Sequence, residues 1–576
     1  MNIEHVEKSY QELESDSTLQ NLIAQANARY ILYNTEESKE NFPRYTIKDE
    51  QLNILAFKYL NIGCNYFSEH NYLKASHSLE KGALILEYIH GSIHIQTKNK
   101  KLFCLISALS YYVCFQYSKA FILIGKLESD TMISSLVSLF LNRKFDQLLS
   151  EIDKLITNSS YGDEYLAEHF EEDNATKIYE IIIAKSLNYY VQFYQTGNKD
   201  FLEIAKKDLV NLQEVAAMRG EPDVWWVIRL LLLIIDGFKE SSLWYVLGNY
   251  FNTEDKLPLK YIQSLVYKNG SITELFLTQR NSLPKVLNNK QGSIVSIPTS
   301  SGKTRIGEIA ILNCLLNEPK AKILFIAPYR SLAYEIENSF DEIFSNLDVS
   351  VSHLYGGSLF SKLDERIIDE SSVIVATPEK AKALFRSNED ILSCIKLVII
   401  DEGHLLGTDK RLIVNEMFYE ELKYHVKANG GRFLLLSAVL PNAEDLSEWL
   451  TDSTDNVYKE NWRPSDERIG IMEWNGVSVN LNWKSTDAER NSFNPNFIMR
   501  QKLPKKPKER IMHYFPENKN QAIASTAYKL RKFGPVLIFV GIKKSVFAIA
   551  REYEKCIQPE EQKFRFRNKA NWRAFK

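Results

Sequence analysis

The spacing of apolar residues changes near residue 265 of this 576-residue chain. Before that point apolar positions recur at helical period and Pro and Gly are sparse, which predicts an all-α region over residues 1–265. Val224–Ile235 is its most apolar run, but the run is too short to cross a bilayer and contains Arg229. We therefore expect a buried helix there.

One stretch of this region has the spacing of a known helical repeat. Small and apolar residues fall at the offsets of a tetratricopeptide unit, namely Tyr59, Ile62, Gly63, Tyr66, Ala75, Leu79 and Ala83. A weaker echo follows at Ala108, Tyr111, Ala120 and Ile124. The two are 45 residues apart, whereas a regular array repeats about every 34. Two interpretations are possible, a tetratricopeptide-like interaction domain and an irregular helical domain. The spacing between the two units differs from that of a regular array, which favours the second interpretation.

Beyond residue 265, short β-branched runs alternate with helical stretches. The expected strands are Ile294–Ile297, Ile323–Ala327, Val373–Ala376, Leu397–Ile400, Phe433–Leu436 and Val536–Val540. Apolar strands between amphipathic helices predict a parallel sheet covered on both faces, with ligands at the carboxyl ends of the strands. Residues 266–451 should form this α/β domain. Residues 452–470 should form a connector, and the rest should form the start of a second α/β domain.

The first expected strand leads into a loop with the composition of a phosphate-binding loop. The loop consists of Pro298, Thr299, Ser300, Ser301, Gly302, Lys303 and Thr304, and a helix should begin near Arg305. Backbone N–H groups would hold phosphate oxygens, Lys303 would reach the β- and γ-phosphates, and the Thr304 hydroxyl would bind Mg²⁺. Ile297 replaces the first glycine of the general GxxxxGK[ST] pattern.

A later strand ends in acidic residues. Leu397–Ile400 runs directly into Asp401, Glu402, Gly403 and His404. Asp401 would hold Mg²⁺ opposite the loop, and Glu402 would orient or deprotonate the attacking water. The loop and the acidic pair together predict a site for ATP and Mg²⁺, without specifying which kind of nucleotidase carries it.

Short motifs at the other strand ends narrow this prediction. They are Ala327–Ala333, Tyr355–Gly357, Ala376–Lys380 and Ser437–Asn442. In order and spacing, residues 270–450 resemble the first RecA-like domain of superfamily 2 DEAD/DEAH-box helicases. Three details are similar to the Ski2-like branch in particular: Pro298–Ser301, Thr377–Lys380 and Asn461–Pro464.

The resemblance implies roles residue by residue. Gln279 would contact adenine, His404 would belong to the ATP-binding motif, and Ser437 and Ala438 would couple the ATP site to strand movement. The family touches the nucleic-acid backbone at the positions of Pro328, Arg330, Gly357, Thr377 and Pro378. Such contacts carry no sequence information, so we expect nonspecific binding of single-stranded or duplex nucleic acid. Val439 replaces the usual Thr, and Gly403 the usual Ala or Val, which puts the coupling in question.

The family also implies a second RecA-like domain with an arginine that completes the ATP site. Neither its nucleic-acid motif nor that arginine is found after Lys544. Two explanations stay open: the sequence is a fragment or frameshifted form of a longer helicase, or a partner supplies the missing half. The first is favoured, and it predicts a chain that binds ATP but hydrolyses it slowly alone.

The overall organisation resembles the helicase subunits of Hachiman antiphage defence systems. That resemblance implies a small nuclease-like effector as partner, docked on the helical region. The alternatives are a nucleotide-gated adaptor whose helical domain is the working part, and a P-loop ATPase that acts on protein.

Composition adds three limits. The net charge is −2, so any nucleic-acid site must be a local patch. The six cysteines form no CxxC pair, which favours reduced thiols and a cytoplasmic protein. The first residues are polar and acidic, with no apolar run of the kind found in a signal peptide.

Overall fold

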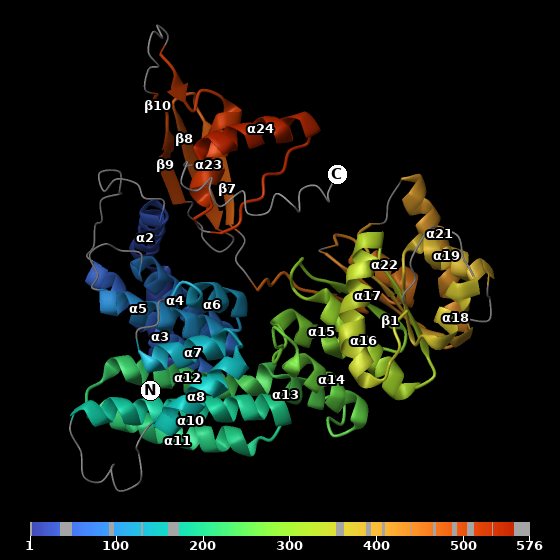
Figure 1. The fold of residues 1–576 in the computed structure, drawn as a ribbon, viewed down its shortest axis with the longest axis horizontal. Coiled ribbons are helices and arrows are strands. Elements are labelled where there is room, and N and C mark those ends of the chain that lie inside the picture. The colour runs from blue at the N-terminus through green and yellow to red at the C-terminus, as the bar shows by residue number, and fades with distance from the viewer. Residues whose placement is uncertain are drawn as a thin grey trace. The chain divides into compact units, whose positions relative to one another are not determined.

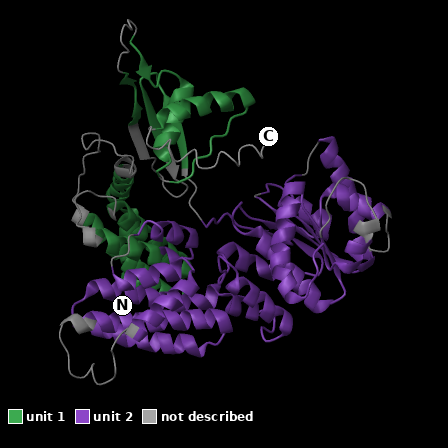
Figure 2. Ribbon diagram, in the orientation of Figure 1, with its two compact units in different colours: residues 1–110, 466–576 green, residues 111–465 purple. Residues whose placement is uncertain are grey.

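The computed structural model describes residues 3–34, 49–90, 97–127, 131–158, 172–352, 362–387, 393–405, 409–438, 440–464, 468–485, 492–503, 512–532 and 534–557. The chain divides into two compact units, one of residues 1–110 with 466–576 and one of residues 111–465 (Figure 2). The second unit contains the phosphate loop and the acidic pair.

The first unit begins with helices α1 (Ile3–Ser15), α2 (Ser17–Asn34), α3 (Asp49–Ser68), α4 (Tyr72–His90) and most of α5 (Thr97–Val113) (Figure 1). A short turn joins α3 to α4, and the two helices pack closely. A Cβ atom added to Gly63 would lie 2.9 Å from the backbone nitrogen of Leu79. The glycine is therefore needed for this approach, as the tetratricopeptide pattern supposes. Assignment to that repeat stays a prediction.

The second unit opens with further helices. They are α6 (Tyr117–Ile124), α7 (Met132–Leu141), α8 (Phe145–Asn158), α10 (Glu172–Thr196), α11 (Asp200–Met218), α12 (Pro222–Ser241), α13 (Leu243–Gly248), α14 (Lys256–Tyr267) and α15 (Leu277–Asn288). Pro222 stands at the start of α12, where its fixed φ suits a first turn. All residues from Val227 to Ile235 except Arg229 are buried. The expected buried helix is confirmed.

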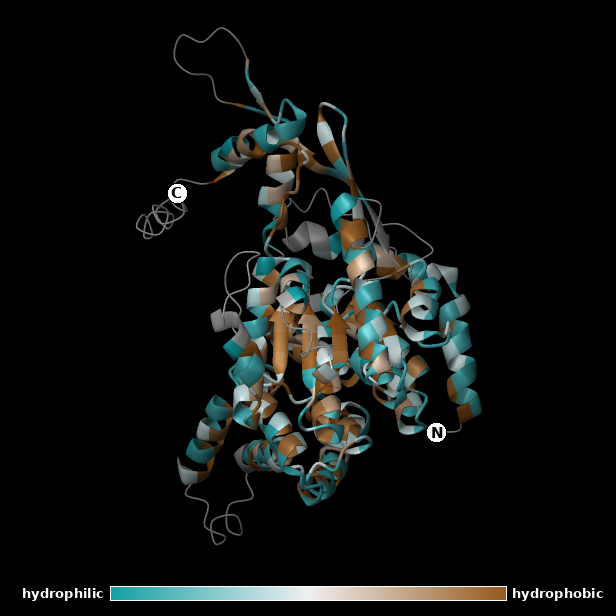
Figure 3. Ribbon diagram, turned by 90° about the vertical axis from the view of Figure 1, so that its right-hand side faces the viewer, coloured by the Kyte–Doolittle hydropathy of each residue, from teal (hydrophilic) through white to brown (hydrophobic). Residues whose placement is uncertain are grey.

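A six-stranded parallel sheet forms the rest of this unit. Its strands are β1 (Gly292–Ser296), β2 (Lys322–Ile326), β3 (Val373–Ala376), β4 (Ile395–Ile400), β5 (Arg432–Ser437) and β6 (Val457–Lys459), in the order β3-β2-β4-β5-β1-β6. The covering helices are α16 (Lys303–Asn317), α17 (Arg330–Phe344), α18 (Lys362–Glu370), α19 (Pro378–Ser387), α21 (Lys410–Ala428) and α22 (Ala443–Thr451), with the short η2 (Ser345–Leu347). The inner strands of the sheet are mostly hydrophobic (Figure 3). The predicted fold class, a RecA-like α/β domain after an all-α region, is confirmed.

The sixth strand corrects one prediction. Residues 452–470 were expected to be a connector, but Val457–Lys459 pairs with β1 in parallel from Ile294 to Ser296. Its three residues are intermediate or exposed. A three-residue edge strand with a solvent-facing side has no continuous apolar run, so its sequence does not show the pattern of a buried strand.

The C-terminal part belongs to the first unit and holds a different sheet. Strands β7 (Arg468–Trp474), β8 (Ser478–Ser485) and β9 (Ser492–Met499) are antiparallel, followed by β10 (Gln501–Lys502), β11 (Tyr514–Phe515), α23 (Lys519–Leu530) and α24 (Lys543–Cys556). The prediction of a strand at Val536–Val540 is wrong. Leu537 is 92% and Phe539 is 90% exposed. No strand among the described residues pairs with this segment, and β-branched residues alone do not hold a strand.

The structure also bears on the hydrophobicity of the helices and on the state of the cysteines. No helix among the described residues is both long and apolar enough to span a membrane. All six cysteines are free thiols, and Cys64, Cys104, Cys114 and Cys314 are buried.

Candidate functional site

The phosphate loop takes its shape from two residues in the left-handed region. It leaves β1 after Ser296 and ends where α16 begins at Lys303. Ser300 has φ 67° and Gly302 has φ 76°. Left-handed residues within a turn direct successive N–H groups into one concavity, which binds anions. The loop therefore has the backbone form that phosphate oxygens require, directly before a helix N-terminus.

Gln279 supports this loop from outside. Its Oε1 accepts a hydrogen bond from the backbone N–H of Phe276 at 2.9 Å, and its Nε2 donates to the carbonyl of Gly302 at 3.0 Å. A Cβ atom at Gly302 would overlap the Gln279 amide. Ser301, which is fully buried, donates to the carbonyl of Trp462 at 3.4 Å. Both the glutamine and the Asn461–Pro464 motif thus contact the loop.

The acidic pair stands at the end of β4, which β5 separates from β1. Asp401 is 8% exposed, and its Oδ1 accepts a hydrogen bond from the backbone N–H of Glu402 at 2.9 Å. Burial, and next the charge of Glu402, raise the pKa of Asp401 to about 6. Glu402 has φ 50°, an uncommon conformation for a residue with a side chain and one that recurs at functional sites.

Lys303 and Glu402 meet across the site. The Lys303 Nζ lies 3.6 Å from the Glu402 Oε2. Both atoms are buried, and neither has a hydrogen-bond partner among the described residues. A buried ammonium and a buried carboxylate oxygen without hydrogen bonds are costly, so their position indicates a function that uses them. They fit a phosphate group at the lysine and a hydrated Mg²⁺ or water near the carboxylate.

His404 connects the acidic pair to β5. Its Nδ1 lies 3.3 Å from the Glu402 Oε2 and 3.3 Å from the Ser437 Oγ. Ser437 is fully buried. The carbonyl of Ala438 accepts a hydrogen bond from the Ser296 Oγ at 3.4 Å, which brings it to the end of β1. These predicted site residues therefore lie together, whereas Val439 is outside the described residues.

The packing of β5 explains why position 403 is a glycine. A Cβ atom at this position would lie 2.5 Å from the Cγ of Leu435. Leu435 is 1% exposed and belongs to the sheet core. The leucine fills the space that an alanine or valine would need, which explains why this chain departs from the usual residue.

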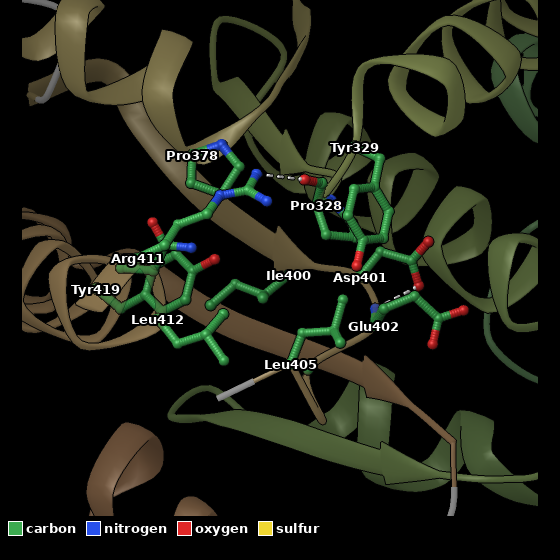
Figure 4. A pocket seen from close by; sticks show the side chains of 12 residues that line it. Pro328, Tyr329, Pro378, Ile400, Asp401, Glu402, Leu405, Arg411, Leu412 and Tyr419 are labelled. Atoms are coloured by element: carbon green, nitrogen blue, oxygen red, sulfur yellow. Dashed lines mark hydrogen bonds between the residues drawn. The ribbon is translucent and has the colours of Figure 1, made fainter. Parts of the chain in front are cut away.

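Two of the predicted nucleic-acid residues meet the acidic pair at a small cavity of about 30 Å³. Pro328 and Pro378 line it together with Asp401 and Glu402 (Figure 4). Thr377 is buried, and its Oγ1 caps α19 by accepting from the Lys380 backbone at 3.4 Å. Arg330 is exposed at the start of α17. Gly357 lies outside the described residues.

Sequence reasoning missed Arg411, which holds two of these motifs together. Its Nη2 donates to the carbonyl of Pro328 at 3.1 Å, and its Nε pairs with Glu379 at 2.8 Å (Figure 4). The guanidinium also lies over the Tyr329 ring, 5.9 Å from its centroid. A lone arginine in the first turn of a helix carries no local signal of such a role, because the partners come from two other strand ends.

Comparison with known proteins agrees with this geometry. The family model described as DEAD/DEAH box helicase matches residues 277–446. The chain is 39% identical to Hachiman protein HamB of Bacillus cereus, over 99% of the chain and 51% of that protein. It is 33% identical to the ATP-dependent DNA helicase Hel308 of Thermococcus kodakarensis, over 38% of the chain and 18% of that protein. A crystal structure of the DUF1998 helicase MrfA bound to DNA is similar at 18% identity and a TM-score of 0.32, covering 37% of this chain and 30% of that one.

The chain thus spans about half the length of HamB and less of Hel308. The family match contains the phosphate loop, the acidic pair and the motif that begins at Ser437. The similarity to HamB extends this agreement through nearly the whole chain. Residues 277–446 thus form a DEAD/DEAH box helicase domain, and the chain as a whole is similar to Hachiman protein HamB.

Proposed function

We propose that the chain binds ATP with Mg²⁺ and is the ATP-binding part of a Ski2-like motor that moves on nucleic acid. One observation carries this proposal: Lys303 and Glu402 face each other at 3.6 Å with buried atoms that lack hydrogen-bond partners. A phosphate oxygen would accept from Lys303, and a water molecule between the phosphate and the acidic pair would donate to Glu402.

Each side chain has a role that fits its position. Lys303 would bind the β- and γ-phosphates, while the backbone N–H groups after Ser300 and Gly302 would hold phosphate oxygens. Thr304 and Asp401 would hold Mg²⁺, which neutralises charge that develops on the transferred phosphoryl group. Binding the cation would favour the ionised form of Asp401, whose pKa burial has raised.

Glu402 would act on the attacking water. Its unusual backbone conformation directs the carboxylate towards Lys303 and His404 rather than along β4. A carboxylate in this position accepts the proton of the water or orients it. His404 and Ser437 would then transmit the state of the ATP site to β5, since both Glu402 and Ser437 lie 3.3 Å from the same imidazole nitrogen.

Nucleic acid would bind at the carboxyl edge of the sheet. Pro328 and Pro378 line the cavity there beside Asp401, Thr377 caps the following α19, and Arg330 is exposed at the start of α17. Hel308 of Thermococcus kodakarensis is an ATP-dependent DNA helicase by name. Contacts to the backbone would give binding without sequence preference.

We further propose a role in antiviral defence, with a nuclease-like effector as partner. The support is the 39% identity with Hachiman protein HamB over almost the whole chain. The helical region of residues 1–265 would be the docking surface. Copurification with and without these residues tests it: partner binding should be lost with the deletion, and retained binding would contradict this surface.

The experiment for the motor measures ATP hydrolysis with and without single-stranded DNA or RNA. Glu402→Gln should bind ATP as the wild type does and lower hydrolysis by about 10²–10⁴-fold, the usual contribution of a general base. If function in cells persists or is locked on in Glu402→Gln, ATP binding alone is the signal and the chain is an adaptor. ATP hydrolysis that a protein stimulates, but that neither nucleic acid stimulates, would contradict the motor and favour an ATPase that acts on protein.

A further inference from the structure

A buried carboxylate joins the helical part of the second unit to the segment that carries Gln279. Glu274 is 5% exposed. It accepts hydrogen bonds from the hydroxyl groups of Tyr112, of Tyr117 at 3.2 Å and of Ser241 at 3.1 Å. Burying a carboxylate costs several kcal/mol unless such donors surround it. The donors come from around α5, α6 and α12, so this is a built junction between distant parts of the sequence.

The chain after Glu274 is fixed by the same helices. The backbone N–H of Leu275 donates to the carbonyl of Ser241 at 2.8 Å. Phe276 then stacks on Tyr117, with ring centroids 6.1 Å apart and planes at 25°. Because Phe276 precedes the helix that carries Gln279, residues of the helical part position the side chain that supports the phosphate loop.

Arg143 adds a cation to this junction. It lies in the turn between α7 and α8 with φ 56°. Its Nη1 donates to the carbonyl of Ser271 at 3.2 Å, and its Nη2 pairs with Glu274 at 3.5 Å. The guanidinium lies over the Tyr117 ring, 5.4 Å from the centroid. A guanidinium has five N–H donors, and these two hydrogen bonds use two of them.

The 21% of the Arg143 side chain that is exposed faces a cavity of about 330 Å³. The residues that line this cavity include Arg143, Gln279, Gly302 and Thr304 of the phosphate loop, and Glu335 of α17. Small-molecule sites occupy roughly 300–1,000 Å³ and combine apolar walls with a few polar groups. A ligand whose phosphates sit in the loop would extend into this space.

We propose that this cavity receives the purine base of the bound nucleotide and that Arg143, a residue of the helical part, contacts that base. The proposal rests on the ATP site proposed above. A planar guanidinium held by Glu274 and Tyr117 is suited to stack on a purine ring or to donate to its ring nitrogens. The Glu335 carboxylate is placed to accept from an exocyclic amino group. The helical part is then a component of the nucleotide site, in addition to any partner surface.

The test compares ATP with inorganic tripolyphosphate, which lacks the base. Arg143→Lys keeps a cation beside Glu274 but loses the planar group. It should lower ATP affinity about tenfold, as expected for a stacked guanidinium, and leave tripolyphosphate affinity unchanged. The control Lys144→Ala, an exposed neighbour in the same turn, should change neither. Equal ATP affinity in wild type and Arg143→Lys, or equal losses for both ligands, would overturn the proposal.

A second measurement needs no variant. Photolabelling of the wild-type chain with 8-azido-ATP should modify peptides that contain Arg143 or Phe276–Gln279. Labels confined to other peptides would overturn the assignment of the cavity. Failure of the wild type to bind either ATP or tripolyphosphate would instead contradict the phosphate loop itself, so the two proposals fail in different ways.

Discussion

Gly302 offers a substitution whose effect can be worked out from the structure. Gly302→Ala places a Cβ atom on a residue with φ 76°, where it would overlap the Gln279 amide nitrogen and lie 3.1 Å from the Gln279 Cδ. The Gln279 side chain must move, and its 3.0 Å hydrogen bond to the Gly302 carbonyl is lost. Gly430→Ala is a matched control: its φ is 73°, but no heavy atom lies within 4 Å of the added Cβ.

Both substitutions place a side chain in the left-handed conformation, but only Gly302→Ala also loses a hydrogen bond. A side chain in the left-handed conformation costs about 1–2 kcal/mol. Loss of the hydrogen bond at Gly302 adds about 1 kcal/mol, or up to about 3 if the carbonyl stays buried without a donor. Gly302→Ala should therefore lower the free energy of unfolding by about 2–5 kcal/mol, and Gly430→Ala by about 1–2 kcal/mol. ATP affinity should fall about tenfold or more in Gly302→Ala, a loss of roughly 1.4 kcal/mol, because the loop N–H groups shift. It should not change in Gly430→Ala.

Urea unfolding and titration with a fluorescent ATP analogue measure both quantities. The double variant Gly302→Ala with Gln279→Ala removes the overlapping amide, so its destabilisation should fall short of the sum of the single variants by about 1 kcal/mol. Additive effects would show that Gln279 does not limit the space at Gly302. Equal destabilisation by Gly302→Ala and Gly430→Ala would refute the same reasoning.

Three further outcomes follow from contacts in the second unit. Gly403→Ala should lower the free energy of unfolding by about 1–3 kcal/mol through overpacking, and combining it with Leu435→Ala should cost less than the sum of the two single variants; additive losses in urea unfolding would contradict the packing. Glu274→Gln should lower the free energy of unfolding by about 2–4 kcal/mol, because it places an amide N–H donor among hydroxyl groups that now donate to the carboxylate. Tyr117→Phe should cost about 1 kcal/mol. If Glu274→Gln costs no more than Tyr117→Phe, the hydrogen bonds of the junction are not cooperative. Arg411→Gln should weaken binding of single-stranded DNA or RNA, since it frees the Pro328 segment; unchanged affinity in a filter-binding assay would show that this arginine is not needed to hold the site.

Much of the ATP site follows from local sequence. A strand, a glycine-containing loop and a helix occur in succession around Lys303, and an apolar strand ends in Asp401 and Glu402. Parallel strands place their carboxyl ends at one edge, so these two segments had to meet. The five strands other than β6 were predictable because each is a short, mainly apolar run.

Other features depend on contacts between distant segments. Glu274 and Arg143 are 131 residues apart, and neither lies in a motif that marks its role. Edge strand β6 is short and polar, so only its pairing with β1 defines it. Val536–Val540 shows the reverse case: its residues favour a strand, yet the described residues provide no neighbour with which it pairs.

We propose that Lys303 and the acidic pair form one site for ATP and Mg²⁺, which a titration of the full 576-residue chain with ATP tests, in the presence of Mg²⁺ and after its removal by a chelator. We expect saturable binding that weakens without Mg²⁺. ATP affinity should fall at least about tenfold in Lys303→Ala and should be unchanged in Lys290→Ala, an exposed lysine just before β1. Equal ATP affinity in wild type and Lys303→Ala would contradict it.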